Sequence, residues 1–414
     1  MYDAIVVGAG HNGLVTAGYL ARVGWKVLVL ERRPLVGGAC VTEEVFPGYR
    51  VSTAAYLVSL MQERVVRDLE LRRFGYDVLP KEPAYFAPHL DGRYLFMYAD
   101  QHRTREALAR FSAKDAERYP AYEQFVERLA RFMEPLLLQA PPNLPPRTPA
   151  DFQALARLGW HVLRRPPAEI GQIVKQIEAY RCEGSSFKIN LALGELPSYS
   201  ALPGTSPGPQ HRGTTHICAS LDSLEHAWDE ARSGTPSSEP LLEITIPTVY
   251  DRSLAPDGKH ILSIFAQYAP YRLRDGQWDA ATRGAFVERV IGLLEQYAPN
   301  IRGSIEHVHA LSPLDLEQEY GLTGGNIFHG ELRLDQLFAL RPVAGWARYA
   351  TPVVGLYLCG SGTHPGGGVT GAPGHNAAQV ILRSAKQGQK SYALFLANNP
   401  TMEARHGRRS IAER

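Results

Sequence analysis

Cysteine is scarce in this sequence, and its four copies are far apart. They are Cys40, Cys182, Cys218 and Cys359. A disulfide framework or a structural zinc site needs cysteines at close, paired spacings, so neither is indicated and we expect four reduced thiols. His307 and His309 lie two residues apart, but no carboxylate or cysteine set accompanies them, so we expect no metal site there.

An excess of charge and a long apolar run are also missing. Lys and Arg number 44 against 42 Asp and Glu, a net charge of +2, so the chain has no field that would gather nucleic acid. No apolar run approaches the roughly 20 residues that span a bilayer. An apolar strand follows Asp3 directly, which leaves no room for a secretion signal. We therefore expect a cytoplasmic protein, or a mitochondrial matrix protein if the source is eukaryotic, with peripheral membrane contact left open.

The start of the chain has the pattern of a βαβ unit. Two runs of four apolar residues, Ala4–Val7 and Val27–Leu30, are typical of short buried parallel strands. Between them apolar residues recur at helical spacing, and Gly24 lies where that helix would end. Because 414 residues exceed a single hydrophobic core, we expect two connected domains.

The first strand leads into a glycine motif with the sequence Gly8-Ala9-Gly10-His11-Asn12-Gly13. Gly8 permits a tight turn, Gly10 lets the backbone approach a pyrophosphate, and Gly13 lets helix and strand pack closely. The helix N-terminus carries roughly half a positive charge, which favours a phosphate there. Glu31 ends the second strand, where it can accept hydrogen bonds from an adenosine ribose and would repel the 2′-phosphate of NADP. The motif therefore predicts a dinucleotide site.

A glycine pair, Gly37 and Gly38, follows shortly after Glu31. This arrangement resembles the extended FAD signature of the glutathione reductase structural superfamily, in which such a pair touches the cofactor's phosphates. The resemblance favours FAD over NAD. The disulfide reductases of that superfamily carry two redox cysteines separated by four residues after the pair, but Cys40 would need its partner at Val45. Disulfide exchange by that mechanism is excluded, and we expect Cys40 to be a packed small residue.

A second glycine-rich run, Gly355–Gly374, is the most specific signal in the chain. It resembles the closing flavin motif of the phytoene desaturase family. Together with Arg181–Lys188 and Gly324–Gly330, it resembles more narrowly the phytoene dehydrogenase-related oxidoreductases, and the match covers most of the chain outside the tail. The resemblance implies that the loop Gly360–Gly371 contacts the ribityl chain and the pyrimidine edge of flavin. A helix N-terminus at this place would stabilise the negative charge of a reduced flavin.

Periodicity between the two motifs predicts one long helix and several strands. The helix spans Asp115–Leu138 and carries an aromatic stripe, which we expect to pack against the protein's own core. Ser186–Leu193 alternates like a half-buried strand, with Lys188 and Asn190 on its polar face. The segment 203–235 is rich in Gly, Pro, Ser and Thr and is expected to have little regular structure. Two further alternating runs suggest an antiparallel sheet: Leu242–Val249 and Ile261–Gln267.

The last third of the chain returns to a parallel-strand pattern. A helix is expected over Ala281–Tyr297, followed by a buried strand at Leu356–Cys359 and a helix that begins near Ala372. Periodicity is lost after about Ser384, so the end of the chain is expected to fray.

These patterns predict an α/β protein in which a Rossmann-like FAD-binding domain of the glutathione reductase type is joined to an antiparallel-sheet plus helical substrate domain. The FAD-binding domain is expected to be discontinuous, comprising 1–60 and 320–385, with the substrate domain at 61–319 and a C-terminal tail at 386–414. The family resembled here carries about a hundred more residues before the strand at Ser186, a length comparable with a small domain. We therefore expect the substrate domain to be shortened near 165–185, with one wall of the adenosine site and the substrate cavity open to water.

Candidate cofactor-binding residues lie in the glycine-rich segments and beside them. They are Gly8, Ala9, Gly10, Asn12, Gly13, Glu31, Arg32, Gly37, Gly38, Ala39, Gly360, Ser361, His364, Val369, Thr370 and Gly371. His329, in a glycine-flanked turn, is the candidate catalytic residue, in contact with flavin or substrate. An ordinary loop histidine stays open as the alternative.

The predicted function is that of an FAD-dependent oxidoreductase of the phytoene dehydrogenase-related type, in which hydride passes from a small apolar organic substrate to flavin. Two alternatives stay open: a non-catalytic partner protein that has lost its substrate cavity, and an amine oxidase-like flavoenzyme. A reductase that uses NAD(P)H directly would need a second glycine motif of the first kind, which the sequence lacks. The oligomeric state is also left open.

Overall fold

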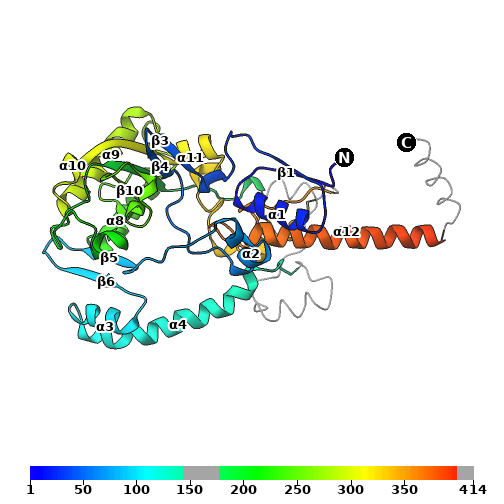
Figure 1. Ribbon diagram of the computed structural model, residues 1–414, viewed down its shortest axis with the longest axis horizontal. Helices are drawn as coiled ribbons and strands as arrows, with labels where there is room; N and C mark the ends of the chain where they lie inside the picture. Colours follow the sequence, from blue (N-terminus) through cyan, green and yellow to red (C-terminus); the bar gives the residue numbers. More distant parts are fainter. Residues whose placement is uncertain (143–176, 352, 354, 399–414) are drawn as a thin grey trace.

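The computed structural model describes residues 1–142, 177–351, 353 and 355–398. It has an α/β architecture with two connected parts (Figure 1). One part contains a seven-stranded sheet, and the other contains a two-stranded parallel sheet and a long C-terminal helix. The predicted fold class is confirmed. The predicted domain boundaries stay predictions, and the expected shortening near 165–185 falls largely on 143–176, outside the described residues.

The parallel sheet is the βαβ unit expected from the sequence. Strands β1 (Ala4–Val7) and β2 (Val27–Leu30) pair in parallel, and helix α1 (His11–Arg22) connects them. The chain leaves the helix through Gly24 at φ +90°, a backbone conformation that glycine adopts without strain. Helix α12 (Ala372–Asn398) packs along α1. A small apolar cluster joins α1 to α2 (Glu63–Asp68) and α12; its members are Val15, Tyr19, Val65 and Ala378.

The seven-stranded sheet has the strand order β11-β7-β10-β9-β8-β5-β6. Its strands are β5 (Tyr85–Pro88), β6 (Tyr94–Met97), β7 (Ser186–Leu193), β8 (Thr214–Ile217), β9 (Leu241–Thr245), β10 (His260–Gln267) and β11 (Ile305–Leu311). Neighbouring strands are antiparallel except β5 and β8, which are parallel. Helix α9 (Ala280–Tyr297) covers one face, where Phe187 of β7 and Phe286 of the helix have ring centroids 4.9 Å apart. This face holds the main hydrophobic core.

The remaining elements are short, apart from one long helix. The antiparallel pair β3 (Thr42–Phe46) and β4 (Tyr49–Ser52) follows the first βαβ unit. The other helices are α3 (Gln101–Ala109), α4 (Ala113–Leu137), α7 (Pro209–Arg212), α8 (Leu221–Arg232), α10 (Ile301–Ser304) and α11 (Pro313–Tyr320). The 3-10 turns are η1 (Gly38–Cys40), η2 (Leu71–Phe74), η4 (Pro247–Val249), η5 (Arg252–Leu254), η6 (Thr323–Gly325), η7 (Leu334–Gln336) and η8 (Phe338–Leu340). Within the described ranges, no helix combines the length and apolarity that crossing a bilayer requires.

Two expectations about the large sheet were wrong. Every residue of β7 is buried, including Lys188 and Asn190, because the segment at Thr53 covers the face opposite α9; the Asn190 amide donates to the Thr53 carbonyl at 3.4 Å. The segment 203–235 contains α7, β8 and α8. Pro209 begins α7, Gly213 lies between α7 and β8, and Gly234 follows the end of α8, so part of the glycine and proline content marks the ends of these elements.

The aromatic stripe of α4 is not packed in the core, contrary to expectation. Tyr122, Phe125, Leu129 and Phe132 are each more than half exposed. Figure 1 shows the helix running beside the body of the molecule, with α3 at one end. At the other end its last carbonyls, those of Leu136 and Leu137, accept hydrogen bonds from side chains near α12.

The predicted strand Leu356–Cys359 does not form. Tyr357 makes only an isolated bridge with Ala350, and Leu356 and Leu358 are exposed. A parallel strand needs a neighbour to satisfy its backbone groups, and in the described part of the chain β1 pairs only with β2. The last helix also differs from expectation, since α12 continues past Ser384 to Asn398.

Candidate functional site

The opening glycine motif forms the tight corner that its sequence predicts. Gly8 has φ +99°, and a Cβ on Gly13 would lie 2.1 Å from the Gly8 carbonyl oxygen. The glycine pair packs against the same corner: a Cβ on Gly38 would lie 3.0 Å from the Gly10 Cα, and the Gly37 N–H donates to the Ala9 carbonyl at 2.8 Å. The two motifs therefore touch, and only glycine allows this approach.

The N-terminus of α1 is open to a ligand. Its N-cap residue, Gly10, offers no side-chain acceptor, and the first turn contains no acidic residue. Helices α3, α4 and α9, in contrast, begin with side-chain caps from Asp100, Ser112 and Asp279. The free N–H groups and the partial positive charge of α1 therefore fit the diphosphate of a dinucleotide.

Glu31 lies beside this corner as predicted. Its carboxylate accepts from the Ala9 N–H at 2.7 Å and from the Arg33 N–H at 3.0 Å. These backbone donors, that of Arg33 first, lower the pKa of the Glu31 carboxyl below its ordinary value. An ionised carboxylate at this place can still accept from ribose hydroxyls. The exposed guanidinium of Arg32 donates to the Glu319 carbonyl at 3.3 Å, and cofactor contact by Arg32 stays a prediction.

The opening and closing motifs meet, although about 350 residues separate them in the sequence. The Asn12 amide donates to the Ser361 hydroxyl at 2.8 Å. The Thr16 hydroxyl donates to the Gly374 carbonyl at 3.0 Å, and a Cβ on Gly374 would lie 2.2 Å from the Asn12 carbonyl oxygen. These contacts hold the start of α12 against the start of α1. One elongated ligand can therefore touch both motifs.

A cavity of about 290 Å³ adjoins this junction. It is lined from the cofactor side by Ala39, Ser361, Gly368, Val369 and His329, and from the sheet side by Tyr56, Glu243, Phe265 and Gln267. Most of its remaining wall is apolar: Ala54, Leu60, Leu322, Ile327 and Phe328. Four of the predicted site residues thus line one cavity: Ala39, Ser361, Val369 and His329.

The sheet side of the cavity carries a polar pair that the sequence did not reveal. The Tyr56 hydroxyl donates to the Glu243 carboxylate at 3.2 Å. Burial first, and then the Glu243 charge, raise the pKa of the Tyr56 phenol above its ordinary value. The two residues come from the segment after β4 and from β9, and no spacing or motif in the sequence links them.

His11 and Cys40 lie at the wall of the same cavity. The His11 Nδ1 atom and the Cys40 sulfur are 3.5 Å apart, and the buried His11 Nε2 atom has no hydrogen-bond partner. An orphaned polar atom facing a cavity fits a site that is completed by a ligand. Burial raises the pKa of the Cys40 thiol to about 11, so the thiol is protonated and unreactive at neutral pH.

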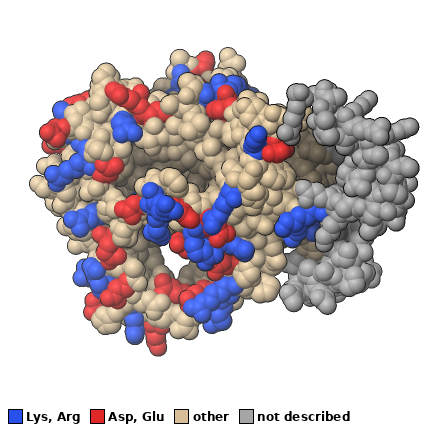
Figure 2. Space-filling model, turned by 45° about the vertical axis from the view of Figure 1, so that its right-hand side comes forward, with Lys and Arg blue, Asp and Glu red and all other residues tan. Residues whose placement is uncertain are grey.

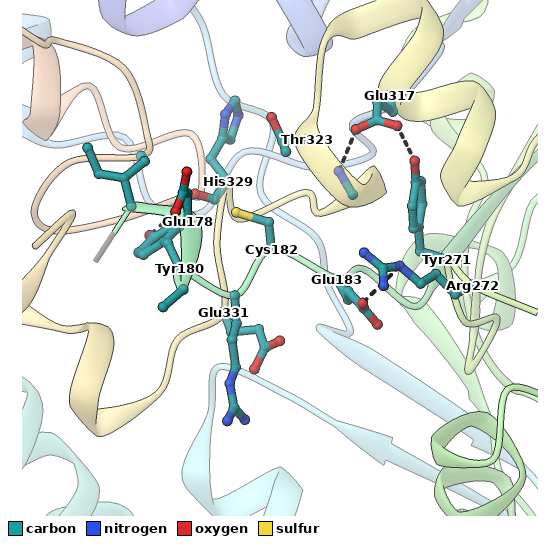
Figure 3. Close-up of a pocket in the computed structure, with 15 residues that line it drawn as sticks. Glu178, Tyr180, Cys182, Glu183, Tyr271, Arg272, Glu317, Thr323, His329 and Glu331 are labelled. Carbon is teal, nitrogen blue, oxygen red and sulfur yellow. Dashed lines mark hydrogen bonds and ion pairs between the residues drawn. The ribbon is translucent and has the colours of Figure 1, made fainter. Parts of the chain in front are cut away.

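His329 lines both the apolar cavity and a second, larger one of about 940 Å³, which Figure 3 shows. Its backbone is in the left-handed region, with φ +55°, and its N–H donates to the Asn326 carbonyl at 2.9 Å. Burial lowers the pKa of its imidazole to about 4, so the ring is neutral at pH 7. Its position beside the cavity fits the predicted contact with flavin or substrate, and its catalytic role stays a prediction.

The larger cavity has a mixed lining of charged, aromatic and sulfur-containing side chains (Figure 3). Two polar pairs occupy one side: the Tyr271 hydroxyl donates to Glu317, and the Arg272 guanidinium lies 3.2 Å from the Glu183 carboxylate. Cys182 lies between these pairs and His329 in the view of Figure 3.

The other predicted residues of the closing motif shape the loop and do not line either cavity. The His364 Nε2 atom lies 2.9 Å from the Leu136 carbonyl of α4, and its own carbonyl accepts from the Tyr349 hydroxyl at 2.7 Å. The Thr370 hydroxyl accepts from the Ala372 N–H at 3.1 Å, at the start of α12. Gly360 and Gly371 are part of this loop, and the backbone of Gly371 has φ +68°. Cofactor contact by His364 and Thr370 stays a prediction.

A buried lysine near the cavity was also not among the site residues predicted from the sequence. The Lys188 ammonium donates to the Asn190 amide oxygen at 2.6 Å and to the Ser263 hydroxyl, and it lies 5.3 Å from the centre of the Phe265 ring, which lines the cavity. Burial lowers its pKa to about 7. Alternation placed Lys188 on the polar face of β7, and only the tertiary structure shows that this face is covered. In the part of the chain that the structure describes, no three His, Cys, Asp or Glu residues are arranged to hold a metal ion.

Comparison with known proteins agrees with this geometry. The model of the NAD(P)-binding Rossmann-like domain family matches residues 6–70, which contain both parts of the opening corner. The chain is 30% identical to pyridine nucleotide-disulfide oxidoreductase domain-containing protein 2 of Rattus norvegicus, over 93% of this chain and 94% of that protein. It is 25% identical to phytoene dehydrogenase of Streptomyces griseus, over 88% of this chain and 92% of that protein.

A solved structure gives a weaker match. Cyclohexylamine oxidase from Brevibacterium oxydans is 13% identical, over 93% of this chain and 99% of that chain, and its TM-score of 0.49 is too low to carry an argument. The alignment with the rat protein has 545 positions, more than the 414 residues of this chain, so the rat protein contains residues without a counterpart here. With this identity over nearly its whole length, the chain belongs to the phytoene dehydrogenase-related family of FAD-dependent oxidoreductases that includes pyridine nucleotide-disulfide oxidoreductase domain-containing protein 2, as predicted from the sequence.

Proposed function

We propose that this protein is an FAD-dependent oxidoreductase that removes hydride from a small apolar organic substrate bound in the 290 Å³ cavity. The observation that carries the proposal is the place of this cavity, between the junction of the two glycine motifs and the large sheet. The N-terminus of α1 would hold the diphosphate, Glu31 the ribose, and the loop 360–371 the flavin. Bound there, FAD supplies an acceptor for two electrons and one proton transferred as hydride.

The chain's own residues shape the cavity for an uncharged substrate. Its wall is largely apolar, so a hydrocarbon portion is stabilised there by leaving water. His329 is neutral at pH 7 and adds no charge to the cavity. The Tyr56 hydroxyl is held on Glu243 and gives the sheet side one fixed polar point, which can orient a polar end of the substrate.

The amine oxidase-like alternative has one observation in its favour. Glu243 brings a carboxylate to the cavity wall, and a carboxylate there would attract an alkylammonium group. The Tyr56 hydroxyl already donates a hydrogen bond to this carboxylate, so an apolar substrate remains the better fit to the cavity.

The non-catalytic alternative also rests on an observation. Val7, Leu35 and Val36, beside the place of the adenosine ribose, are exposed, so this end of the site is open to water. Weak FAD binding would follow from such an open wall, and a chain without bound FAD would have no oxidoreductase activity.

The experiment is anaerobic reduction of the FAD-loaded protein, followed through the visible absorption band of oxidised flavin. Limonene serves as the apolar probe and cyclohexylamine as the amine probe. Bleaching by limonene alone supports the proposal, and bleaching by cyclohexylamine alone supports the amine oxidase-like alternative. A folded protein that takes up no FAD supports the non-catalytic alternative. Ala55→Phe, which fills the cavity wall, should abolish the bleaching, whereas the exposed Ala113→Phe should not.

The expected setting is part of the same proposal. A net charge of +2 does not attract nucleic acid, so we propose the small substrate as the binding partner. We place the protein in the cytoplasm, or in the mitochondrial matrix of a eukaryote. The exposed apolar face of α4 keeps a peripheral membrane contact open. Cell fractionation tests this placement.

A further inference from the structure

Arg341 is the largest fully buried side chain in the described part of the structure, with an exposure of 0%. One guanidinium nitrogen, Nη2, donates to three main-chain carbonyls: those of Phe328 at 2.7 Å, Ser361 at 3.0 Å and His329 at 3.2 Å. The other, Nη1, donates to the Glu331 carbonyl at 3.4 Å. Arg341 thereby fastens the His329 turn to the closing flavin loop.

The charge of Arg341 is not neutralised by a carboxylate. All four of its acceptors are uncharged carbonyl oxygens, and none of the ion pairs between described residues includes it. Its Nε atom is buried without a partner, and the nearest aromatic ring, that of Tyr180, is centred 5.8 Å from its Cζ. Burying an unpaired charge is costly, so a neutral side chain would serve better if only packing were needed here.

The charge lies directly behind the wall of the apolar cavity. Phe328, His329 and Ser361, whose carbonyls hold the guanidinium, all line that cavity. Burial first, and also the field of Arg341, lower the pKa values of His329 and of His364, which lies within the closing loop. In an interior of low dielectric constant, such a fixed charge acts across the cavity wall with little screening.

We propose that Arg341 is an electrostatic residue of the flavin site whose unneutralised charge stabilises the negative charge that hydride transfer would place on the flavin. This inference rests on the proposed function. Hydride carries two electrons and one proton, so breaking one substrate C–H bond in this way would add one unit of negative charge to bound FAD and leave the substrate one unit more positive, until the substrate releases a proton to water. A cation already in place, without a counter-ion and without rotation of its side chain, lowers the energy of that charge.

Sulfite affinity of the FAD-loaded protein measures this effect without turnover, because sulfite adds to oxidised flavin and leaves a negative charge on its ring system. Arg341→Met removes the charge and should weaken sulfite binding at least tenfold. Arg341→Lys keeps the charge but loses the planar fork, and it should stay within about threefold of the wild type. A purely structural role would predict equal losses in both variants.

A second pair of variants keeps the inference testable if Arg341→Met fails to fold or to bind FAD. Tyr180→Glu places a carboxylate beside the guanidinium and should neutralise it, which weakens sulfite binding severalfold. The matched control Tyr180→Gln removes the same ring without adding charge and should retain most of the affinity.

Unchanged sulfite affinity in FAD-loaded Arg341→Met, or equal affinity in Tyr180→Glu and Tyr180→Gln, would overturn the inference and leave the proposed function intact. Failure of the wild-type protein to bind added FAD would overturn both. Flavin absorbance is recorded before each sulfite titration, so the two failures are distinguished.

Discussion

At the scale of single residues, the site depends on glycines at positions where the Cβ of any other residue would clash with its neighbours. A Cβ on Gly13 would lie 2.1 Å from the Gly8 carbonyl oxygen within the opening motif, and a Cβ on Gly374 would lie 2.2 Å from the Asn12 carbonyl oxygen at the junction of α1 and α12. The Asn12 to Ser361 hydrogen bond closes the same junction. Because these contacts lie within the opening motif or between the two glycine motifs, small changes there should affect cofactor binding more than the rest of the fold.

Gly13→Ala should weaken FAD binding at least tenfold and destabilise the protein by about 1–3 kcal/mol, since the added methyl group must displace the Gly8 carbonyl. The matched control is Gly292→Ala in α9, where a Cβ meets open space. That change should stabilise the protein by about 0.5–1 kcal/mol and leave FAD affinity unchanged. FAD titration and urea unfolding measure both effects. Equal FAD affinity in Gly13→Ala and the wild type would show that the corner does not hold the diphosphate.

Lys188 should give the protein's stability a distinct pH dependence. Its pKa falls from 10.5 to about 7 on burial, so between these values the unfolded chain binds the proton that the folded chain has released. The free energy of unfolding therefore rises with pH across this window. Urea unfolding at pH 7, 8 and 9 should show a steeper rise for the wild type than for Lys188→Met. The control Lys114→Met, at an exposed position, should follow the wild type. If the free energy of unfolding changed with pH equally in the wild type and in Lys188→Met, the lowered pKa of Lys188 would be contradicted.

At the scale of elements, the sequence predicted those segments whose pattern matches their environment. Strand β7 was expected with the bounds that it has, and α9 begins one residue before its predicted start, because both carry apolar residues at the period of their structure. The strand at Leu356–Cys359 failed for a different reason. Its apolar run predicts burial between neighbours, but the neighbouring strand is absent from the described chain, and a pattern in one segment does not report on another.

The site residues also divide into those that a local motif predicted and those that it did not. Local motifs predicted the glycine corner, Glu31 and the cavity-lining loop residues, since each motif carries its own geometry. Tyr56, Glu243 and Lys188 come from separate elements, and only the sheet topology brings them to the cavity or its wall. Arg341 likewise escaped prediction, because its partners are main-chain carbonyls, which leave no signature in the sequence.

The exposed stripe of α4 leads to a prediction about surface and core. Phe125→Ser should change the free energy of unfolding by no more than about 0.5 kcal/mol, because the ring is 59% exposed. Phe286→Ala, in the core between β7 and α9, should cost about 3–5 kcal/mol. Denaturant unfolding of both variants checks the contrast. A loss above about 2 kcal/mol for Phe125→Ser would show that this helix face is covered in solution.

At the scale of the whole molecule, the chain keeps both flavin motifs in contact while the parallel sheet that supports them is reduced to two strands in the described residues. Ile5, Val7 and Leu30 leave apolar surface of this sheet exposed. The residues of the rat relative that have no counterpart here fit such a loss of cover, and their place in the chain stays a prediction. Cofactor binding should therefore contribute a large share of this part's stability.

Titration of the purified protein with FAD, followed by absorbance and by unfolding temperature, tests the central claim most directly. We expect that the wild type takes up one FAD per chain and unfolds at a higher temperature when loaded, and that Gly13→Ala shows a weaker effect. A folded wild type that takes up no FAD, with an unchanged unfolding temperature, would contradict it.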